Sequence, residues 1–554
     1  MEKLSSTLIN LLKNRGVTSK DEIEEFLSDK PKKTYDPSLL PDMEEGVDLI
    51  LSEIKSGSKI CIYGDYDADG VTSTALMFSV LSHIIDGDRL DFYIPSRFDE
   101  GYGLNKEAVK TISDRGFNMI ITVDCGSVSA EEVAYAKELG LSVLVTDHHN
   151  ITDVMADCLL INPKKPGSVY PFSNLSGCGV AFKVAQMIQR KACLPKSVLT
   201  EVMDLAAIGT VGDIMPLLDE NRTLVKYGIK IINMGTRFGL RKLIEGAGLK
   251  VGAVSSENIG FVIVPHLNAS GRLEDASQAV KLLLLKEGDP YAQDIVDDLL
   301  FKNRERRRLQ QETYKKCISL CEEQIIREDS NKFLLINAGD AHEGIAGIVA
   351  GKIKDTYYRP TVLVTPSGED QEFFKGTGRS IEGVDLYGLL KLHESCFEKF
   401  GGHAGACGFL MKAERLEKLR TDLNEDMKNL LSAHPDLFIK KHCFDLTLSP
   451  KNLTMDFAEQ ISLLEPFGNK NPEPLIKLKD VIPSDIKKMG TEGQHLSFTV
   501  ADCEGNRIKC VLFNKAALYE GVVVNCESIS VIGSLTCNVW QGQKRLQFIV
   551  REIL

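Results

Sequence analysis

The chain has 554 residues, enough for about three or four domains that each bury a hydrophobic core. Its net charge of −12 argues against a protein that binds nucleic acid over its whole surface, although an acidic surface can still surround a local basic groove. It has no apolar run of membrane-spanning length, no signal-peptide pattern and no Cys-x-x-Cys pair among its 14 cysteines, so we expect a soluble cytoplasmic protein with no membrane association.

Apolar periodicity predicts five segments in chain order. A helical extension comes first, followed by an α/β lobe with the strand–helix alternation of a doubly wound parallel sheet and then by a long polar helix. A second α/β lobe follows, after which the apolar period changes to two and predicts a small all-β barrel. The predicted bounds are 1–45 for the extension, 46–289 for the first lobe, 290–328 for the helix, 329–435 for the second lobe and 455–554 for the barrel.

Three acidic clusters occur in the first lobe, and each follows directly on a short, apolar, β-branched run. Such a run, bounded by turn residues, predicts a buried parallel strand. In a doubly wound sheet the loops after neighbouring strands meet at the carboxyl edge, so we expect the acidic side chains to converge there. The clusters are GDYDADG at residues 64–70, VDCG at 123–126 and TDHH at 146–149.

The side chains expected to converge are carboxylates and imidazoles, with no thiolate. Carboxylates packed together repel one another unless cations neutralise them, and these ligand types favour Mn²⁺ or Mg²⁺ over a structural zinc. An Asp after a strand can instead cap the next helix, as Asp69 could do before a helix near 73–85, but three acidic strand ends together favour a centre of two metal ions. The converging residues are Asp65, Asp67, Asp69, Asp124, Asp147, His148 and His149.

Arg97 and Tyr102 follow another predicted strand of the first lobe. An arginine for phosphate and an exposed aromatic for base stacking are typical of single-strand binding, although a surface loop with a packed tyrosine fits the pattern equally well. Trp540, at a predicted turn of the barrel, is a further stacking candidate. The basic run at 302–308 could line a groove or form a solvated helix face.

Three glycine-rich or small-residue segments contain groups that could bind an anion. Residues 375–380 combine backbone N–H groups with a cation and hydroxyls, and residues 400–406 place an imidazole among glycines. Residues 268–272 place an arginine among small neighbours, which suits bidentate contact with a phosphate. Each of these segments, taken alone, could equally be an ordinary turn.

With these motifs in order, the chain resembles the DHH phosphoesterase superfamily, named for the Asp-His-His motif at 147–149. The order of the motifs and the C-terminal barrel resemble the bacterial single-strand-specific 5′→3′ exonucleases of that superfamily over nearly the whole chain. The motifs that carry the resemblance are GDYDADG at 64–70, EGYGLN at 100–105, VGD at 211–213, NASGRLEDA at 268–276 and GGHAG at 401–405.

The resemblance implies a DHH domain and a DHH-associated domain, joined by the long helix, and an OB fold for the barrel. It implies that Asp124 bridges two metal ions and that His149 contacts the scissile phosphate, which makes these two residues catalytic. Related pyrophosphatases carry a histidine ligand where this chain has Tyr63, so the first ion's ligand set stays partly open. The implied metal ligands are Asp65, Asp67, Asp69, Asp124, His148 and Asp213; the implied substrate contacts are Arg97, Tyr102, Ser270, Arg272, Thr377, Arg379, Gly402 and His403.

The activity implied by the resemblance is hydrolysis of single-stranded DNA, 5′→3′, by two Mn²⁺ or Mg²⁺ ions, in DNA repair and recombination. Implied partners are single-stranded DNA, a helicase and a single-strand-binding protein, and we expect a monomer. A small-molecule or short-oligonucleotide phosphoesterase of the superfamily is the alternative, but such relatives do not ordinarily need the barrel. A catalytically inactive DNA-binding scaffold is a third hypothesis, disfavoured because the implied metal ligands are intact.

Overall fold

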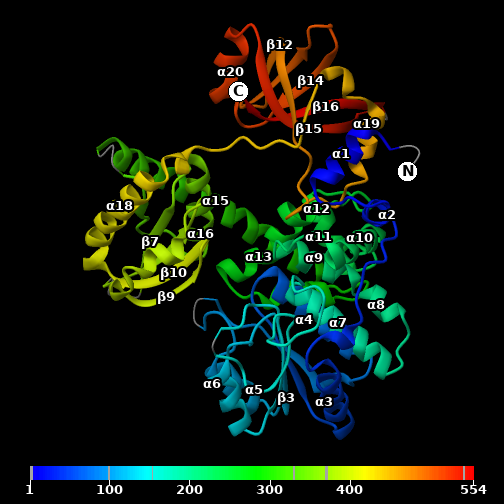
Figure 1. Cartoon of the computed structure of the whole chain (residues 1–554). Coiled ribbons are helices and arrows are strands. Elements are labelled where there is room, and N and C mark those ends of the chain that lie inside the picture. Colours follow the sequence, from blue (N-terminus) through cyan, green and yellow to red (C-terminus); the bar gives the residue numbers. More distant parts are fainter. Residues whose placement is uncertain (1–3, 98–99, 153, 328–330, 368–371, 541–542) are drawn as a thin grey trace. The chain divides into compact units, whose positions relative to one another are not determined.

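The computed structural model describes residues 4–97, 100–152, 154–327, 331–367, 372–540 and 543–554 (Figure 1). The chain forms two compact units. The first unit contains Met1–Leu267, Ser277–Val296 and Cys443–Leu554, and the second contains Asn268–Ala276 and Asp297–His442. Among the residues that the structure describes, no helix is both long and apolar enough to cross a bilayer.

The first sheet is parallel throughout, and its strand order is β2-β1-β3-β4-β5. From β1 the chain continues to β2 on one side and then to β3 on the other, so β1 and β3 flank the topological switch point, where ligands of such sheets bind. The strands are β1 (Ile60–Tyr63), β2 (Leu90–Tyr93), β3 (Met119–Val123), β4 (Ser142–Thr146) and β5 (Leu159–Ile161).

Helices cover both faces of this sheet, which confirms the predicted doubly wound fold. Side chains of α5 and α6 pack on one face in a common core with Tyr63, Ile120 and Val145, while α3, α4 and α7 pack on the other face (Figure 1). These helices are α3 (Met43–Ser56), α4 (Ala68–Leu81), α5 (Lys106–Asp114), α6 (Ala130–Glu138) and α7 (Gly177–Lys191).

A helical layer continues the first unit. Its helix α9 is apolar on all sides and buried over most of its length because it packs against α4, α7 and α10, and its end presents Asp213. The helices are α8 (Ser197–Glu201), α9 (Met203–Gly212), α10 (Asp219–Met234), α11 (Phe238–Gly246), α12 (Ser256–Asn258), a π-helix at Ile259–Ile263 and α14 (Ser277–Leu284). Helix α13 (Val264–Leu273) starts in the first unit and belongs to the second unit from Asn268 on.

The N-terminal helices α1 (Ser6–Asn14) and α2 (Lys20–Leu27) join distant parts of the first unit. Leu8, Leu11 and Leu12 pack in one buried cluster with Leu464, which lies in the C-terminal segment. Arg222 of α10 donates to the backbone oxygens of both Phe26 and Glu465, so one buried guanidinium contacts the extension and the C-terminal segment.

The predicted long helix is confirmed as α15 (Ala292–Arg327). The second lobe has a mixed sheet of order β6-β7-β8-β10-β9, in which only β6 and β7 pair in parallel. Its elements are β6 (Leu334–Asn337), α16 (Glu343–Tyr357), β7 (Thr361–Ser367), β8 (Phe373–Arg379), α17 (Leu386–Lys391), β9 (Phe397–His403), β10 (Ala406–Lys412) and α18 (Leu416–Ala433).

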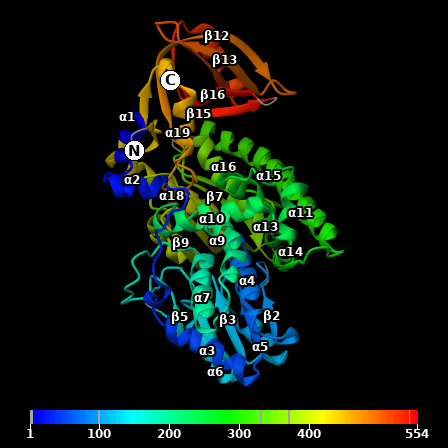
Figure 2. The ribbon, with the colours of Figure 1, turned by 90° about the vertical axis from the view of Figure 1, so that its right-hand side faces the viewer.

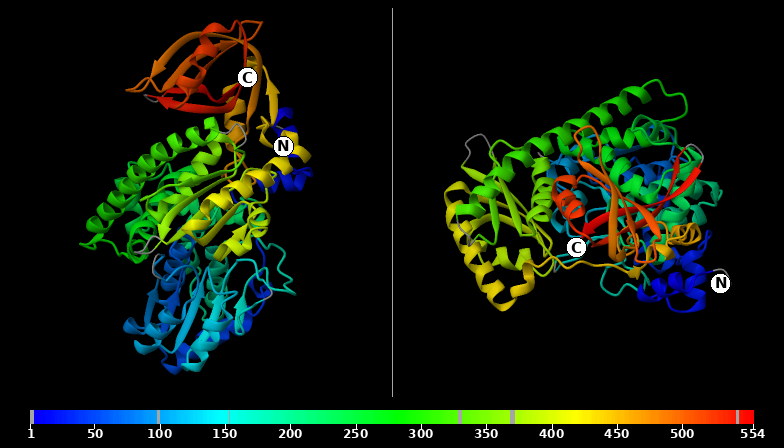
Figure 3. Two further views of the ribbon diagram at one scale, coloured as in Figure 1. Left: turned by 90° about the vertical axis from the view of Figure 1, so that its left-hand side faces the viewer. Right: turned by 90° about the horizontal axis from the view of Figure 1, so that it is seen from above.

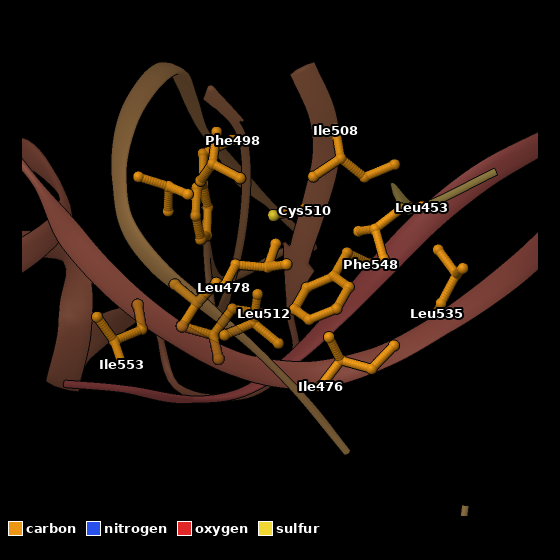
Figure 4. Close-up of a cluster of buried hydrophobic side chains, with 14 of the residues drawn as sticks. Leu453, Ile476, Leu478, Phe498, Ile508, Cys510, Leu512, Leu535, Phe548 and Ile553 are labelled. Atoms are coloured by element: carbon orange, nitrogen blue, oxygen red, sulfur yellow. The ribbon is translucent and has the colours of Figure 1, made fainter. Parts of the chain in front are cut away.

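The C-terminal segment is a closed barrel, as predicted, because β12 pairs with both β13 and β15. Its strands curve into a barrel (Figures 2 and 3). Leu478, Phe498 and Phe548 belong to the apolar core inside it (Figure 4). The elements are β11 (Leu446–Leu448), α19 (Met455–Ser462), β12 (Ile476–Met489), β13 (His495–Ala501), β14 (Arg507–Leu512), α20 (Ala516–Asn525), β15 (Ile529–Trp540) and β16 (Gln543–Ile553).

Candidate metal centre

The loop after β1 is shaped by Asp67, which caps α4. Its Oδ1 accepts hydrogen bonds from the backbone N–H groups of Asp69 (2.9 Å) and Gly70 (3.1 Å). The expected helix near 73–85 therefore begins earlier, at Ala68, and Asp67 rather than Asp69 is the cap. Gly70 is required here, since a β-carbon at position 70 would stand 2.5 Å from the backbone oxygen of Asp65.

Asp69 lies inside the first turn of α4 and points at the start of α7. Its two oxygens accept hydrogen bonds from the backbone N–H groups of Gly177 (2.6 Å) and Cys178 (3.0 Å). These are donors that the first turn of a helix leaves free, and the positive end of the helix dipole favours a carboxylate there. A β-carbon at Gly209 would lie 2.4 Å from Oδ1 of Asp69, so α9 also approaches the site through a glycine.

Asp124 follows β3 and has a left-handed backbone, with φ of 63°. This conformation is uncommon outside glycine and often marks functional sites, and Asp is among the residues that tolerate it. The N–H of Asp124 donates to Thr146 of β4 at 3.0 Å, which holds the turn against the neighbouring strand.

His148 lies among three buried or half-buried carboxylates. Its Nε2 is 3.1 Å from Oδ1 of Asp124, 3.5 Å from Oδ2 of Asp213 and 3.9 Å from Oδ2 of Asp69. These residues come from the ends of β4, β3 and α9 and from the start of α4, and only the tertiary fold brings them together.

The possible metal-ligating atoms fall into groups whose members all lie within 4.8 Å of one another. All six predicted metal ligands belong to these groups. The groups are Asp65, Asp67 and Asp124; Asp69, His148 and Asp213; and Asp124, His148 and His149.

The chemistry of these donors fits divalent cations. Among the described residues, the buried atoms Oδ1 of Asp65, Oδ1 of Asp124, Oδ2 of Asp213 and Nε2 of His148 form no well-aligned hydrogen bond, although Nε2 of His148 and Oδ1 of Asp124 lie 3.1 Å apart. Unpaired buried acceptors are unfavourable unless something positive meets them, and oxygen and imidazole ligands suit Mn²⁺ or Mg²⁺.

The pKa values of the cluster also indicate that it binds cations. Burial, reinforced by neighbouring carboxylates, raises the pKa of Asp65 to about 8, of Asp69 to about 7 and of Asp213 to about 8. Burial likewise raises the pKa of Asp124 well above its ordinary value and lowers the pKa of His148 to about 3, which keeps that imidazole neutral. Without cations the carboxyl groups would hold protons, and two divalent ions would replace that positive charge.

We expected Asp147 to converge with the metal ligands, but it is in none of the groups of possible metal ligands. It orients the loop that carries His148 and His149 instead. Its Oδ2 accepts from the N–H of Ser127 (3.0 Å), and its Oδ1 accepts from the N–H groups of His148 (2.7 Å) and His149 (3.1 Å) and from Nδ1 of His149 (2.8 Å). Burial alone would lower the pKa of His149, but the hydrogen bond and charge of Asp147 raise it, which favours a charged imidazolium.

Tyr102 and Arg97 lie at the carboxyl edge of the first sheet, where the metal ligands also lie. The hydroxyl of Tyr102 lies 3.1 and 3.2 Å from the two ring nitrogens of His149, and Tyr102 itself is 53% exposed. The guanidinium of Arg97 stands over the ring of Tyr66, 5.1 Å from its centroid. The side chain of Trp540 lies outside the described residues.

The other predicted substrate contacts belong to the second unit. Arg272 donates to the backbone oxygen of Gly344 at 3.0 Å, at the start of α16. A β-carbon at Gly347 of the same helix would meet Arg379 at 2.9 Å and Thr377 at 3.1 Å, so these side chains gather along one helix. Gly402 and His403 of β9 and Thr377 and Arg379 of β8 flank the same strand, β10. Ser270 lies in α13, two residues before Arg272.

Sequence reasoning missed the residues that support the ligands. Gly177 and Gly209 permit the close approach of α7 and α9, and Asn162 donates through Nδ2 to Oγ of Ser127 and to the backbone oxygen of His149, both at 2.9 Å. The glycines are visible in the sequence, but which carboxylate each one faces depends on helix packing.

The chain matches three family models: the DHH family N-terminal domain at residues 59–210, the DHHA1 domain at 331–429 and the RecJ OB domain at 444–552. It is 37% identical over 555 residues to the single-stranded-DNA-specific exonuclease RecJ of Bacillus subtilis (strain 168), covering 99% of this chain and 68% of that protein. The chain belongs to the RecJ family.

Further comparisons with RecJ proteins support the assignment of the chain to this family. RecJ of Escherichia coli (strain K12), also named a single-stranded-DNA-specific exonuclease, is 33% identical over 580 residues, covering 100% of this chain and 96% of that protein. The crystal structure of RecJ in complex with Mn²⁺ from Thermus thermophilus superposes with a TM-score of 0.83 at 27% identity, covering 99% of this chain and 76% of that one. A Mg²⁺ complex of RecJ from the same organism has a TM-score of 0.76 at 26% identity, with 99% and 74% coverage.

Proposed function

We propose that this RecJ-family chain is a metal-dependent exonuclease that degrades single-stranded DNA 5′→3′ by two-metal hydrolysis, in DNA repair and recombination. The observation that carries the proposal is the cluster of six buried or half-buried ligands, in which Asp65, Asp124, Asp213 and His148 have unpaired buried atoms that suit divalent cations. In the similar RecJ structures the metals are Mn²⁺ and Mg²⁺.

Two groups of residues would hold the ions. Asp65, Asp67 and Asp124 would hold one, and Asp69, His148 and Asp213 the other, with Asp124 between them, since its Oδ1 is 3.1 Å from His148. When bound, two divalent ions supply an activated water and neutralise charge on the phosphate oxygens.

The chain's own residues would then orient the substrate. His149, whose pKa is raised by Asp147 and whose side chain is 43% exposed, would donate to the scissile phosphate as charge develops there. Tyr102, exposed beside it, would stack on a base, and Arg97, held over Tyr66, would contact a backbone phosphate.

The second unit and the barrel would bind the rest of the strand. We assign the 5′ phosphate to the second unit, because Arg272, Thr377 and Arg379 gather beside α16 and His403 lies across β10 from Arg379. An OB barrel suits single strands through a basic groove and stacking side chains. The residues assigned to the phosphate are Ser270, Arg272, Thr377, Arg379, Gly402 and His403.

We also propose the partners, the oligomeric state and the cellular location of this enzyme. A nuclease restricted to single strands needs duplex DNA to be opened first, so a helicase and a single-strand-binding protein are the partners that we propose. We further propose that the protein acts as a monomer in the cytoplasm.

The test uses the full chain with Mn²⁺ and a long single-stranded DNA labelled separately at each end, beside the matching blunt duplex. We expect rapid release of short products from the 5′ label, a ladder from the 3′ label and an intact duplex. Cleavage of dinucleotides or pyrophosphate with both DNA substrates intact would contradict the proposal and indicate a small-molecule phosphoesterase.

A further inference from the structure

Lys164 lies in the loop after β5, at the sheet edge that carries the metal ligands. Because β5 pairs in parallel with β4, this loop runs beside the loop of His149. Asn162 joins the two loops, since its Nδ2 donates to the backbone oxygen of His149 at 2.9 Å and its Oδ1 accepts from the N–H of Lys164 at 2.8 Å. Asn162 is fully buried, so these bonds fix the backbone of Lys164 next to the metal centre.

The side chain of Lys164 is half-buried, and within the described part of the chain its ammonium has no hydrogen-bond or ion-pair partner. Burial lowers its pKa, while the charges of Asp147 and Asp213 act in the opposite direction, which places the ammonium within electrostatic reach of both. Asp147 is already occupied by four N–H donors, and Asp213 faces His148. Neither carboxylate therefore holds the lysine.

A partly desolvated ammonium attracts an anion more strongly than one in bulk water, because the effective dielectric constant around it is lower. Lysine binds phosphate as a flexible point charge and needs no fixed fork geometry. The anion that must approach this edge of the sheet is the substrate itself.

We propose that Lys164 is a further substrate-binding residue, whose ammonium contacts a backbone phosphate of the single strand beside His149. The inference rests on the proposed function and adds to it a contact that no motif of the chain contains.

The chain offers a matched control in the next residue. Lys165 is also half-buried, but its ammonium is paired with Asp42, on the side of the loop occupied by the start of α3. Lys164→Met and Lys165→Met remove the same charge from adjacent positions of one loop, so a difference between them reports where the ammonium lies and not the net charge.

The experiment measures kcat/KM on single-stranded DNA with saturating Mn²⁺ over a series of salt concentrations, for the wild type, Lys164→Met, Lys165→Met and Lys164→Arg. One lost phosphate contact should reduce the slope of log(kcat/KM) against log[salt] by about 0.7, the value for a single strand. We expect this reduction, with a lower kcat/KM at low salt, for Lys164→Met alone, and recovery in Lys164→Arg. Thermal melting checks that each variant is folded.

The outcomes separate the inference from the proposed function. If the wild type and Lys165→Met cleave single-stranded DNA and Lys164→Met keeps the wild-type salt slope, the inference is wrong and the proposed function stands. A change confined to the Mn²⁺ concentration for half-maximal rate would also overturn the inference, since it would show that Lys164 only offsets the carboxylates. If the wild type and Lys165→Met do not cleave single-stranded DNA at all, the proposed function fails and the inference falls with it.

Discussion

Gly177 lies so close to Asp124 that a β-carbon at position 177 would stand 2.3 Å from Oδ1 of that carboxylate. The same glycine donates its N–H to Oδ2 of Asp69 at 2.6 Å. The first residue of α7 therefore lies against one ligand of each proposed ion. The metal centre can form only because this residue has no side chain.

Substitution of Gly177 by alanine should disrupt metal binding, because the new methyl group must displace Asp124. We expect Mn²⁺ affinity to fall by about 10-fold or more, as when groups that orient metal ligands are removed. Isothermal titration with Mn²⁺ measures this. Gly179→Ala is the control in the same helix, because its β-carbon would meet nothing closer than 3.3 Å and should leave the affinity unchanged. Equal affinities in both variants would show that α7 does not set the position of Asp124.

Asp124→Asn should abolish hydrolysis and leave the fold intact. Asparagine tolerates the left-handed backbone of position 124 as aspartate does, so the turn is preserved while the shared charged ligand is lost. A loss of about 4 kcal/mol of transition-state stabilisation corresponds to a rate about 10³-fold lower. Single-turnover cleavage measures the rate and thermal melting the fold; near-wild-type cleavage would rule out Asp124 as the bridging ligand.

The stability of the metal-free protein should fall as pH rises from about 4 to about 8. The pKa values of Asp65 and Asp213 are raised to about 8, and that of Asp69 to about 7, above the ordinary 3.8, chiefly by burial. Between the ordinary and the raised values the folded state holds protons that the unfolded chain has released, so stability is lost as pH rises through the raised values. Thermal melts in EDTA at several pH values measure this loss.

Mn²⁺ should reverse that trend, because it binds the deprotonated carboxylates and its affinity therefore increases with pH. The increase in melting temperature on adding Mn²⁺ should be larger at about pH 8.5 than at about pH 6.5. Titrations in two buffers of different ionisation enthalpy should report proton release near pH 7. No proton release would mean that these carboxyls are already ionised in the metal-free protein.

Asp147→Asn should lower kcat while Mn²⁺ binding persists. The amide that replaces one carboxylate oxygen cannot accept from all four N–H groups, and His149 loses the charge that keeps it protonated. We expect a decrease in kcat of about 10- to 100-fold, typical of residues that orient a functional group. Stopped-flow cleavage and Mn²⁺ titration separate the two effects; a variant that loses the metal instead would place Asp147 among the ligands.

The local sequence was sufficient to predict much of this protein. Short β-branched runs with acidic residues directly after them predict parallel strands and a shared carboxyl edge, since strand direction and the doubly wound order follow from the strand–helix alternation. The period-two pattern likewise predicted the barrel. The sequence pattern predicts a start of α4 that is too late, because an aspartate at position 69 or 67 can cap the helix and only the structure shows that Asp67 has that role.

Only the tertiary structure decided how the site is assembled. Asp213 lies in the metal centre because α9 packs between α4 and α10. Asp147 is not among the ligands, because its two oxygens accept hydrogen bonds from four N–H groups. The ammonium of Lys165 is paired with Asp42, whereas that of Lys164 has no such partner within the described part of the chain. Sequence specifies which donors and charges exist along the chain, but pairing among them depends on distances of a few ångströms between segments far apart in sequence, and those distances are set by packing.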